Sequence, residues 1–209
     1  MRLDVALVKL GYFSSRSRAK ECIKRGLVLV NGKVVTKPSA EVPDGAKIEV
    51  LAKDVPRGYW KLKEVDERFR LFSGKEVVLD LGSSAGGFLL YASERAKFVY
   101  GIEYSREFEG ILRSIESARS NVKVFIADAF TFDVSLLPEL DVILDDLTLD
   151  FDSSMKALMR FLPKLKRGGK ILFVHKLGSE ANFEGFEVLD YFDAADRKER
   201  YYLLRWANV

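Results

Sequence analysis

The fold of this chain of 209 residues is decided by the stretch VLDLGSSAGGF, residues 78–88. An apolar run over residues 77–81 predicts a strand, and the glycines Gly82, Gly86 and Gly87 follow it. Glycine lets a backbone turn sharply and approach a ligand closely. We therefore expect a strand, a tight loop and a helix that together bind a nucleotide-like ligand.

The chain on either side of this stretch alternates apolar strands with amphipathic helices. A helix is expected over residues 59–72, and a strand near residues 186–189. Further apolar runs predict strands at residues 98–102, 122–127, 142–144 and 171–174. Such alternation indicates an α/β fold with a mostly parallel, doubly wound sheet and helices on both faces, in other words a Rossmann-like domain.

Acidic residues stand at the predicted ends of the first three strands. Asp80 comes two residues before Gly82, Glu103 ends the second strand, and Asp128 ends the third. A carboxylate at the end of the second strand can accept both hydroxyls of a ribose, and one at the third can accept a hydrogen bond from an exocyclic amine. The set indicates an adenosine site. The alternative is that these carboxylates cap the helices that follow them.

The first 51 residues have a different pattern. Residues 2–10 and a segment from Ser14 or Ser15 to about Arg25 have the apolar spacing of two helices, each closed by a glycine. Asn31-Gly32 between two short apolar runs predicts a hairpin over residues 27–35, and residues 48–51 predict a last strand. We expect a small α+β module.

Charge divides the chain in the same way. Residues 1–63 hold 14 Lys or Arg against 6 Asp or Glu, a balance of +8, which leaves 20 against 25, or −5, for the rest. This asymmetry suggests a basic module that binds a polyanion. A solvated basic surface without a partner is the alternative.

The segment RLDVALVKLGYFSSRSRAKECIKRGLVLVNGKVVTKP, residues 2–38, closely resembles the alpha-L RNA-binding module first known from a small-subunit ribosomal protein. The resemblance implies that this module, placed at residues 1–52, binds structured RNA through phosphates and shape. The candidate RNA-binding residues are its basic side chains: Arg2, Arg16, Arg18, Lys20, Lys24, Arg25 and Lys33.

Beyond a linker at residues 53–58, residues 59–209 resemble the FtsJ group of ribose 2′-O-methyltransferases. The order of the two parts is similar to the TlyA family of rRNA methyltransferases. The resemblance implies S-adenosylmethionine as cofactor, and the residues predicted to bind it are Asp80, Gly82, Ser83, Ser84, Gly86, Gly87, Phe88, Glu103 and Asp128. The partner that it implies is structured RNA, with rRNA preferred.

The same resemblance implies a Lys-Asp-Lys-Glu tetrad around the acceptor hydroxyl. Matching the segments PRGYWKL, DVILDDL, GGKILFVHK and DRKERYYLL places its members at Lys61, Asp146, Lys176 and Glu199. Lysines there would stabilise a developing alkoxide, and the carboxylates would orient the lysines and the hydroxyl. Each residue also has a plain interpretation as a solvated charge. A non-catalytic RNA-binding or ribosome-assembly factor with a degenerate methyltransferase domain is the alternative function.

Several classes are disfavoured by residues that the sequence lacks. Cys22 is the single cysteine and His175 the single histidine, so we expect neither a disulfide nor a structural or catalytic metal. Cys22 is expected in the core of the basic module, and His175 on the opposite face of its strand from Lys176. No apolar run approaches the roughly 20 residues of a membrane span. We expect a cytoplasmic protein, sufficient as a monomer, that does not associate with membranes.

Overall fold

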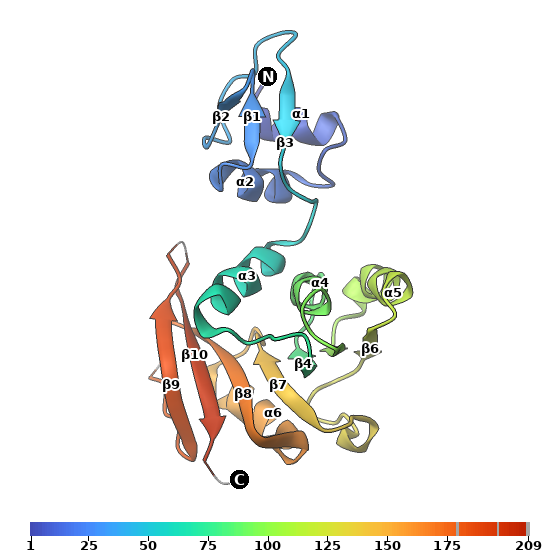
Figure 1. Cartoon of the computed structure of the whole chain (residues 1–209), viewed down its shortest axis with the longest axis vertical. Coiled ribbons are helices and arrows are strands. Elements are labelled where there is room, and N and C mark those ends of the chain that lie inside the picture. The colour runs from blue at the N-terminus through green and yellow to red at the C-terminus, as the bar shows by residue number, and fades with distance from the viewer. Residues whose placement is uncertain (179, 196, 208–209) are drawn as a thin grey trace. The chain divides into compact units, whose positions relative to one another are not determined.

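The computed structural model describes residues 1–178, 180–195 and 197–207. The chain forms two compact units, Met1–Arg57 and Gly58–Val209, and the division falls inside the predicted linker. Figure 1 follows the chain through both, and each unit is described by itself below. In the described part of the chain, no helix is both long and apolar enough to cross a bilayer.

The N-terminal unit is the expected α+β module. It contains two helices and a three-stranded antiparallel sheet in the order β2-β1-β3. Its elements are α1 (Leu3–Lys9), α2 (Arg16–Lys24), β1 (Val28–Val30), β2 (Lys33–Val34) and β3 (Ile48–Val50). Ser15 caps α2 by accepting the backbone N–H of Arg18, as one of the two predicted caps. Leu3 and Leu7 of α1 and Ile23 of α2 are fully buried, and Cys22 is 1% exposed, so its predicted place in the core is confirmed.

The hairpin between β1 and β2 turns at Asn31-Gly32, as predicted. Both residues have left-handed φ, 51° and 74°, which is what a two-residue hairpin turn of this kind requires. The side chain of Asn31 also accepts the backbone N–H of Lys47 at 2.9 Å and so joins the turn to the segment that leads into β3.

The larger unit is built on a seven-stranded sheet in the order β6-β5-β4-β7-β8-β10-β9. Strands β4 to β8 pair in parallel, whereas β10 is antiparallel to both of its neighbours. The strands are β4 (Val77–Leu81), β5 (Phe98–Glu103), β6 (Val122–Ile126), β7 (Leu140–Asp145), β8 (Leu165–Lys176), β9 (Phe186–Asp193) and β10 (Glu199–Trp206). The predicted mostly parallel α/β fold is confirmed.

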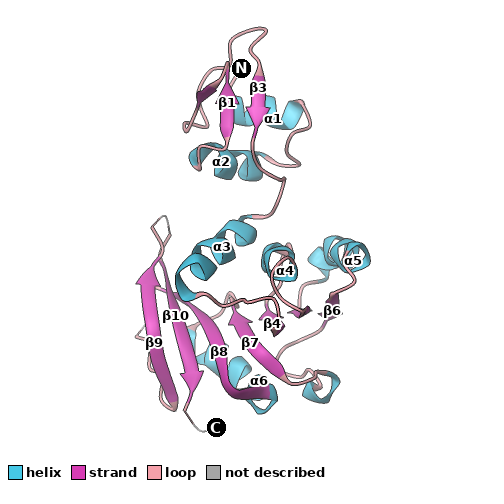
Figure 2. Ribbon diagram, viewed as in Figure 1, coloured by secondary structure: helices cyan, strands magenta, loops and turns pink. Residues whose placement is uncertain are grey.

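The order of the strands reverses at β4, because the chain moves outward to β5 and β6 and then returns to β7 on the other side. Right-handed crossovers therefore place α4 (Gly87–Ser93) and α5 (Glu109–Ala118) on one face and α6 (Phe151–Phe161) on the other (Figure 2). The helix α3 (Arg57–Phe69) lies on the face of α4. Open α/β sheets bind ligands at such a reversal, at the carboxyl ends of the strands.

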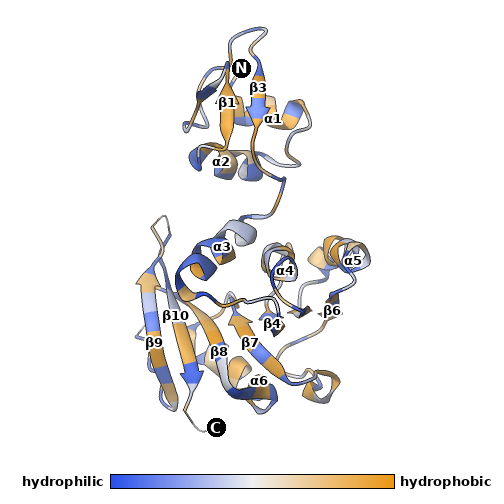
Figure 3. Ribbon diagram, viewed as in Figure 1, coloured by the Kyte–Doolittle hydropathy of each residue, from blue (hydrophilic) through white to orange (hydrophobic). Residues whose placement is uncertain are grey.

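One hydrophobic core lies between the central strands and α6, and apolar residues of α3, α4 and α5 are also buried. Figure 3 shows hydrophobic residues along β7 and β8 and a mixed pattern on the edge strand β9. Leu79 and Leu81 of β4 pack with Phe173 of β8 and with Leu158 and Phe161 of α6, all at most 1% exposed. Since alternate residues of a strand face opposite sides, Asp80 between the two leucines points to the face of α3 and α4.

Several predicted elements differ in length from those observed, and two of the differences have a clear local cause. The helix expected over residues 59–72 ends at Phe69, because Arg70 has φ 50° and the carboxylate of Asp66 accepts the backbone N–H groups of Leu71 and Phe72. The strand β8 begins six residues before residue 171, and its pairing with β7 shifts register between Leu140 and Val142. Residues 166–170, Lys-Arg-Gly-Gly-Lys, contain no apolar run, so the sequence pattern does not predict the first half of this strand.

The glycines of residues 82–87 serve packing as well as turning. Gly86, the N-cap residue before α4, has φ 81°, and a Cβ there would collide with Ile115 of α5. Gly87 lies against the start of α3, where a Cβ would stand 2.6 Å from the backbone nitrogen of Tyr59 and 2.7 Å from the Cα of Gly58. The sequence predicts a ligand-binding role for these glycines, and the structure adds the contacts of α4 with α3 and α5.

We expect Gly87→Ala to destabilise the larger unit by about 1–3 kcal/mol, because backbone atoms must move to admit the methyl group. Urea denaturation followed by tryptophan fluorescence measures this, since Trp60 and Trp206 both belong to that unit. The matched control is Gly110→Ala in α5, where the added Cβ meets no described atom within 4 Å apart from its chain neighbours and the nearby backbone of its own helix. It should leave stability unchanged or raise it by up to about 1 kcal/mol. Equal midpoints for the two variants would contradict the packing role of Gly87.

Candidate active site

The four residues of the predicted tetrad form a closed ring of alternating charge, here called the lysine–carboxylate ring. The Nζ of Lys61 lies 2.7 Å from both carboxylate oxygens of Asp146 and 2.9 Å from Oε2 of Glu199. The Nζ of Lys176 lies 2.9 Å from Oδ1 of Asp146 and 2.7 Å from Oε1 of Glu199. Each ammonium group therefore contacts both carboxylates, and each carboxylate contacts both ammonium groups.

Four separate elements supply the ring at one end of the sheet. Lys61 comes from α3, Asp146 follows the last residue of β7, Lys176 ends β8, and Glu199 begins β10. Because β10 runs antiparallel to β8, its first residue Glu199 stands directly opposite Lys176 in the register. The antiparallel strand thus brings an acid from near the C-terminus to the carboxyl end of the parallel strands.

The two lysines have unlike surroundings. Lys61 is 5% exposed, with the rings of Phe88 and Tyr201 each 5.8 Å from its Nζ, whereas the side chain of Lys176 is 33% exposed. Burial lowers the pKa of Lys61 below its usual value. Burial also opposes the charge of Lys176, but the carboxylates of Asp146 and Glu199 outweigh it and raise its pKa. Lys176 is therefore the more exposed of the two ammonium groups, and its surroundings favour its charged form.

His175 lies on the other side of its strand from Lys176, as alternation predicts. It is 3% exposed, and its ring lies 5.5 Å from that of Phe151 and 6.4 Å from that of Tyr202. The histidine belongs to the core on the face of α6 and not to the ring.

The loop after β4 is tied to the end of β5. Glu103, 8% exposed, accepts the backbone N–H of Ser84 and that of Ser105, each at 2.7 Å. Asp128 accepts the backbone N–H of Phe130 at 2.8 Å, two residues ahead in its own turn. Both acids therefore do cap local backbone, as the alternative interpretation held. Each carboxylate oxygen has a second lone pair that such a bond leaves available.

Asp80 stands out among the residues predicted to bind the cofactor. It is fully buried, and neither carboxylate oxygen accepts a hydrogen bond from any residue in the described part of the chain. Burial raises the pKa of Asp80 to about 8, and the charges of Asp146 and Glu103 act in the same direction, against the lowering effect of the Ser83 hydroxyl. A buried polar group without a partner is costly, so this carboxyl is suited to a ligand that supplies a donor or a positive charge.

Asp145 is a second buried acid that the sequence analysis passed over in favour of its neighbour Asp146. It is 1% exposed, and its Oδ2 has no hydrogen-bond partner among the described residues. Burial raises its pKa to about 8 as well, although its Oδ1 accepts the backbone N–H of Leu147. The doubled acid at the end of a buried strand was visible in the sequence. The sequence did not show that Asp145 would be buried.

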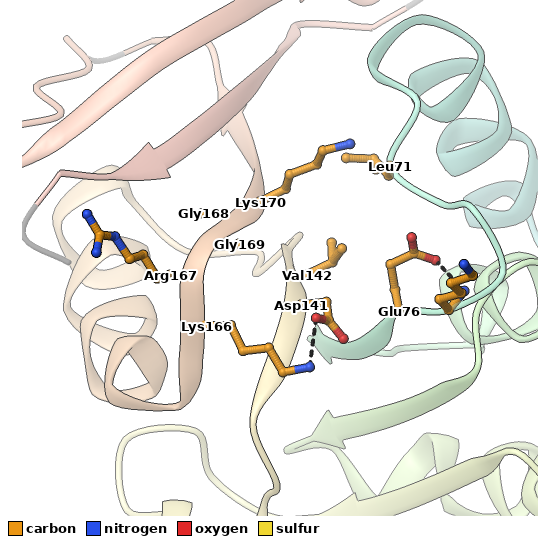
Figure 4. A pocket seen from close by; sticks show the side chains of 10 residues that line it. Leu71, Glu76, Asp141, Val142, Lys166, Arg167, Gly168, Gly169 and Lys170 are labelled. Atoms are coloured by element: carbon orange, nitrogen blue, oxygen red, sulfur yellow. Dashed lines mark hydrogen bonds and ion pairs between the residues drawn. The ribbon is translucent and has the colours of Figure 1, made fainter.

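A separate pocket of about 240 Å³ lies at the opposite, amino-terminal edge of the sheet (Figure 4). Asp141 and Val142 of β7 and the start of β8 line it, and Lys166 bonds Asp141 across it at 2.9 Å. Lys170 instead donates to the backbone carbonyl of Arg70. The lining holds none of the residues predicted for the tetrad or the cofactor.

The basic residues predicted to bind RNA all lie in the N-terminal unit, and most have partners inside it. Arg2, Arg16 and Lys20 surround Asp4. Arg18 pairs with Asp54, and Arg25 with Glu21. Lys24 and Lys33 are exposed.

The arrangement in both units matches known families. A sequence profile described as S4 domain matches residues 1–48, and one described as FtsJ-like methyltransferase matches residues 55–179. The second match covers more than half of the chain, which therefore belongs to the FtsJ-like methyltransferase family and carries an S4 domain in front of it.

The resemblance to the TlyA family is confirmed by curated relatives. The chain is 37% identical to Hemolysin A of Brachyspira hyodysenteriae over 106 residues, 49% of this chain and 44% of that protein. It is 35% identical to the 16S/23S rRNA (cytidine-2′-O)-methyltransferase TlyA of Mycobacterium tuberculosis over 91 residues, 42% of this chain and 34% of that one. The matches thus span less than half the length of these relatives.

Solved structures share the fold. A Streptococcus thermophilus protein proposed to be a hemolysin superposes with a TM-score of 0.61 at 21% identity, over 100% of this chain and 89% of that one. Aeropyrum pernix fibrillarin, crystallised with natively bound S-adenosyl-L-methionine, superposes at 0.60 and 18% identity, over 78% and 80% of the two chains. The predicted Rossmann-like methyltransferase fold is confirmed.

The buried acids make the stability of the larger unit depend on pH. The pKa of Asp80 is about 8 in the folded protein and near 4 in the unfolded chain, so between these values the folded state holds a proton that the unfolded state releases. The contribution of Asp80 to the free energy of unfolding is fully present below pH 4 and is lost as the pH rises through 8.

We therefore expect the free energy of unfolding to fall between pH 5 and 8 less steeply in Asp80→Asn than in the unmodified protein. Urea titrations at several pH values measure the two slopes, and the slope is independent of any constant loss of stability in the variant. Parallel pH profiles would rule out a protonated Asp80.

Proposed function

We propose that this protein is an S-adenosylmethionine-dependent methyltransferase that modifies a ribose 2′-hydroxyl of structured RNA, with rRNA as the preferred class. The observation that carries the proposal is the lysine–carboxylate ring at the carboxyl ends of β7 and β8, beside the strand reversal where such sheets bind ligands. Membership in the FtsJ-like methyltransferase family supports it.

The reaction requires stabilisation of the negative charge that develops on the ribose 2′-oxygen. A ribose hydroxyl is a poor nucleophile because it holds its proton at neutral pH. Lys176 is exposed enough to reach this oxygen, and its raised pKa keeps it protonated, so it stabilises the negative charge that develops there. Asp146 accepts a hydrogen bond from the hydroxyl and takes its proton as the oxygen is methylated.

The remaining two members of the ring hold the first two in place. Lys61 binds both oxygens of Asp146 and so fixes the plane of that carboxylate, while Glu199 holds Lys176 from the other side. Side chains fixed before the substrate arrives need no rearrangement during the reaction, which lowers the barrier. Buried Lys61 thus positions the two groups that touch the substrate.

The residues at the end of β4 fit the cofactor. S-adenosylmethionine supplies an electrophilic methyl group on a sulfonium cation. The unpartnered carboxyl of Asp80 suits the cation or an N–H donor of such a ligand, and the loop from Gly82 to Phe88 lies beside it. Glu103 and Asp128 retain lone pairs for the ribose hydroxyls and the adenine amine.

The N-terminal unit would bring RNA to this site. Its S4 domain profile and its net charge support binding to structured RNA, and small ribosomal subunit protein uS4 of Aquifex aeolicus is 42% identical over 69 residues, which cover 32% of this chain. We extend the partner proposed for the whole chain to rRNA because its TlyA relative is described as acting on 16S and 23S rRNA. A monomer with both units suffices for this scheme, and the cytoplasm is its expected location.

Loss of either group that touches the substrate should remove activity. We expect Asp146→Ala and Lys176→Ala each to lower the rate of methyl transfer at least about 10²-fold, as removal of one charge-stabilising donor does in other enzymes. Transfer of labelled methyl groups to purified rRNA measures the rate. Protection of the modified linkage from alkaline hydrolysis identifies the 2′-oxygen as the acceptor.

Arg167→Ala is the control for these variants, because Arg167 is an exposed cation at the opposite edge of the sheet. It should retain full activity. A methylated product that stays sensitive to alkali would show that the methyl group is on a nucleobase and not on the 2′-oxygen. An Asp146→Ala variant with full activity would show that the lysine–carboxylate ring takes no part in the reaction.

Cofactor binding should depend on the charge of Asp80. A cationic ligand favours the ionised carboxyl, so we expect the affinity for S-adenosylmethionine to rise with pH, by up to about tenfold per unit below pH 8. Calorimetric titrations from pH 6 to 9 measure this, and Asp80→Asn should bind more weakly with a flatter profile. A protein that binds RNA but gives no heat with S-adenosylmethionine at any pH would instead be a non-catalytic RNA-binding factor.

A further inference from the structure

A buried carboxylate lies beneath the basic surface of the N-terminal unit. Asp4, the second residue of α1, is 0% exposed, which is rare for an aspartate unless cations surround it. Three cations from two places in the chain do so here. Arg2 immediately precedes α1, and Arg16 and Lys20 belong to the first two turns of α2.

Each of the two arginines binds Asp4 through a pair of guanidinium N–H groups, here called a fork. Arg2 places Nε 3.0 Å from Oδ1 of Asp4 and Nη2 3.3 Å from Oδ2. Arg16 places Nη2 2.8 Å and Nε 3.3 Å from the same Oδ2. The Nζ of Lys20 lies 3.9 Å from this oxygen. Each guanidinium group thus binds Asp4 along its Nε edge and keeps its outer edge, formed by Nη1 and the second N–H of Nη2, for another acceptor.

The same cations remain open to a ligand. The side chains of Arg2, Arg16 and Lys20 are 45%, 51% and 44% exposed, although the carboxylate that holds them is completely covered. Burial raises the pKa of Asp4, but the hydrogen bonds from Arg2 and Arg16 outweigh this and bring it to about 2, so the carboxylate stays ionised. Three positive charges around one negative charge leave an excess of two facing outward.

We propose that Asp4 is a positioning residue that holds Arg2 and Arg16 as a paired guanidinium clamp for a phosphodiester of structured RNA, with Lys20 beside them. This inference rests on the RNA binding proposed above for the N-terminal unit. The ligand class follows from the donors, because parallel N–H groups of a guanidinium match the oxygens of a phosphate.

The physical gain comes from order fixed in advance. A free arginine side chain carries about 2 kcal/mol of rotamer entropy, part of which is lost on binding, and two adjacent guanidinium groups repel each other. Asp4 removes both obstacles before the ligand arrives, since it already orders the side chains and screens their mutual repulsion. Preorganisation of this kind raises affinity without adding a contact.

For a variant without the charge of Asp4, the proposal predicts weaker binding to RNA, whereas net charge alone predicts tighter binding. Asp4→Asn removes a negative charge and makes the unit more basic, which by charge alone should tighten binding to a polyanion. If Asp4 orders the clamp, affinity should fall about 5- to 20-fold. The slope of log affinity against log salt should also become shallower by about one unit, the share of one phosphate contact.

Fluorescence anisotropy of the full-length chain with a labelled RNA hairpin, between about 50 and 200 mM salt, measures both quantities. The matched control is Glu49→Gln on β3, which removes a partly exposed carboxylate of the same unit whose ion pair among the described residues is with Lys47. It should bind equally well or slightly more tightly. An Asp4→Asn variant that keeps its melting temperature and binds RNA as tightly as the control would overturn the proposal.

If Asp4→Asn unfolds the unit, Arg16→Lys provides the same test, because it keeps the charge and loses the fork. A lysine ammonium cannot face Asp4 and a phosphate along two parallel bonds, so affinity should fall at least about threefold, and unchanged affinity would overturn the clamp. The unmodified chain tests the proposed RNA binding by itself: if it binds neither an RNA hairpin nor purified rRNA, that proposal fails. If it binds and the variants bind equally well, only the clamp fails.

Discussion

The buried ammonium group of Lys61 is the constraint on which the larger unit depends. A charge at 5% exposure is costly unless carboxylates surround it, and Asp146 and Glu199 do so from two different strands. The helix α3, the end of β7 and the start of β10 must therefore all be in place before the charge is compensated. Assembly of the lysine–carboxylate ring therefore requires these elements of the unit to be folded together, and Lys176 completes the ring at its exposed side.

The site combines compensated charges with uncompensated ones. Within the ring each charge has two opposite neighbours, whereas Asp80 and an oxygen of Asp145 lie buried with no hydrogen-bond partner in the described part of the chain. The first arrangement is suited to holding groups still, and the second to receiving a ligand that brings its own donor or cation. Both lie near the reversal of strand order at β4, so the topology explains why a reactive group and a cofactor would meet there.

The two units use carboxylates in the same way. In the larger one, Asp146 and Glu199 hold two lysines in one geometry, and in the smaller one, Asp4 holds Arg2 and Arg16. The net charges of +8 and −5 in the two parts of the sequence conceal this, because they count residues and not contacts. An acidic residue within a basic surface can strengthen the binding of a polyanion if it orders the cations around it.

The sequence by itself determined the strands, the hairpin at Asn31-Gly32, the family and the types of the four ring residues, because apolar periodicity and short motifs are local properties of the chain. The tertiary structure alone decided what these residues do to one another. Which lysine is buried, and how the four charges meet, depends on elements far apart in the sequence, since Lys61 of α3 contacts Asp146, which is 85 residues away, and Glu199 of β10. Gly87 and Asp4 show the same limit, since a close contact with α3 and a cluster of cations exist only after helices have packed.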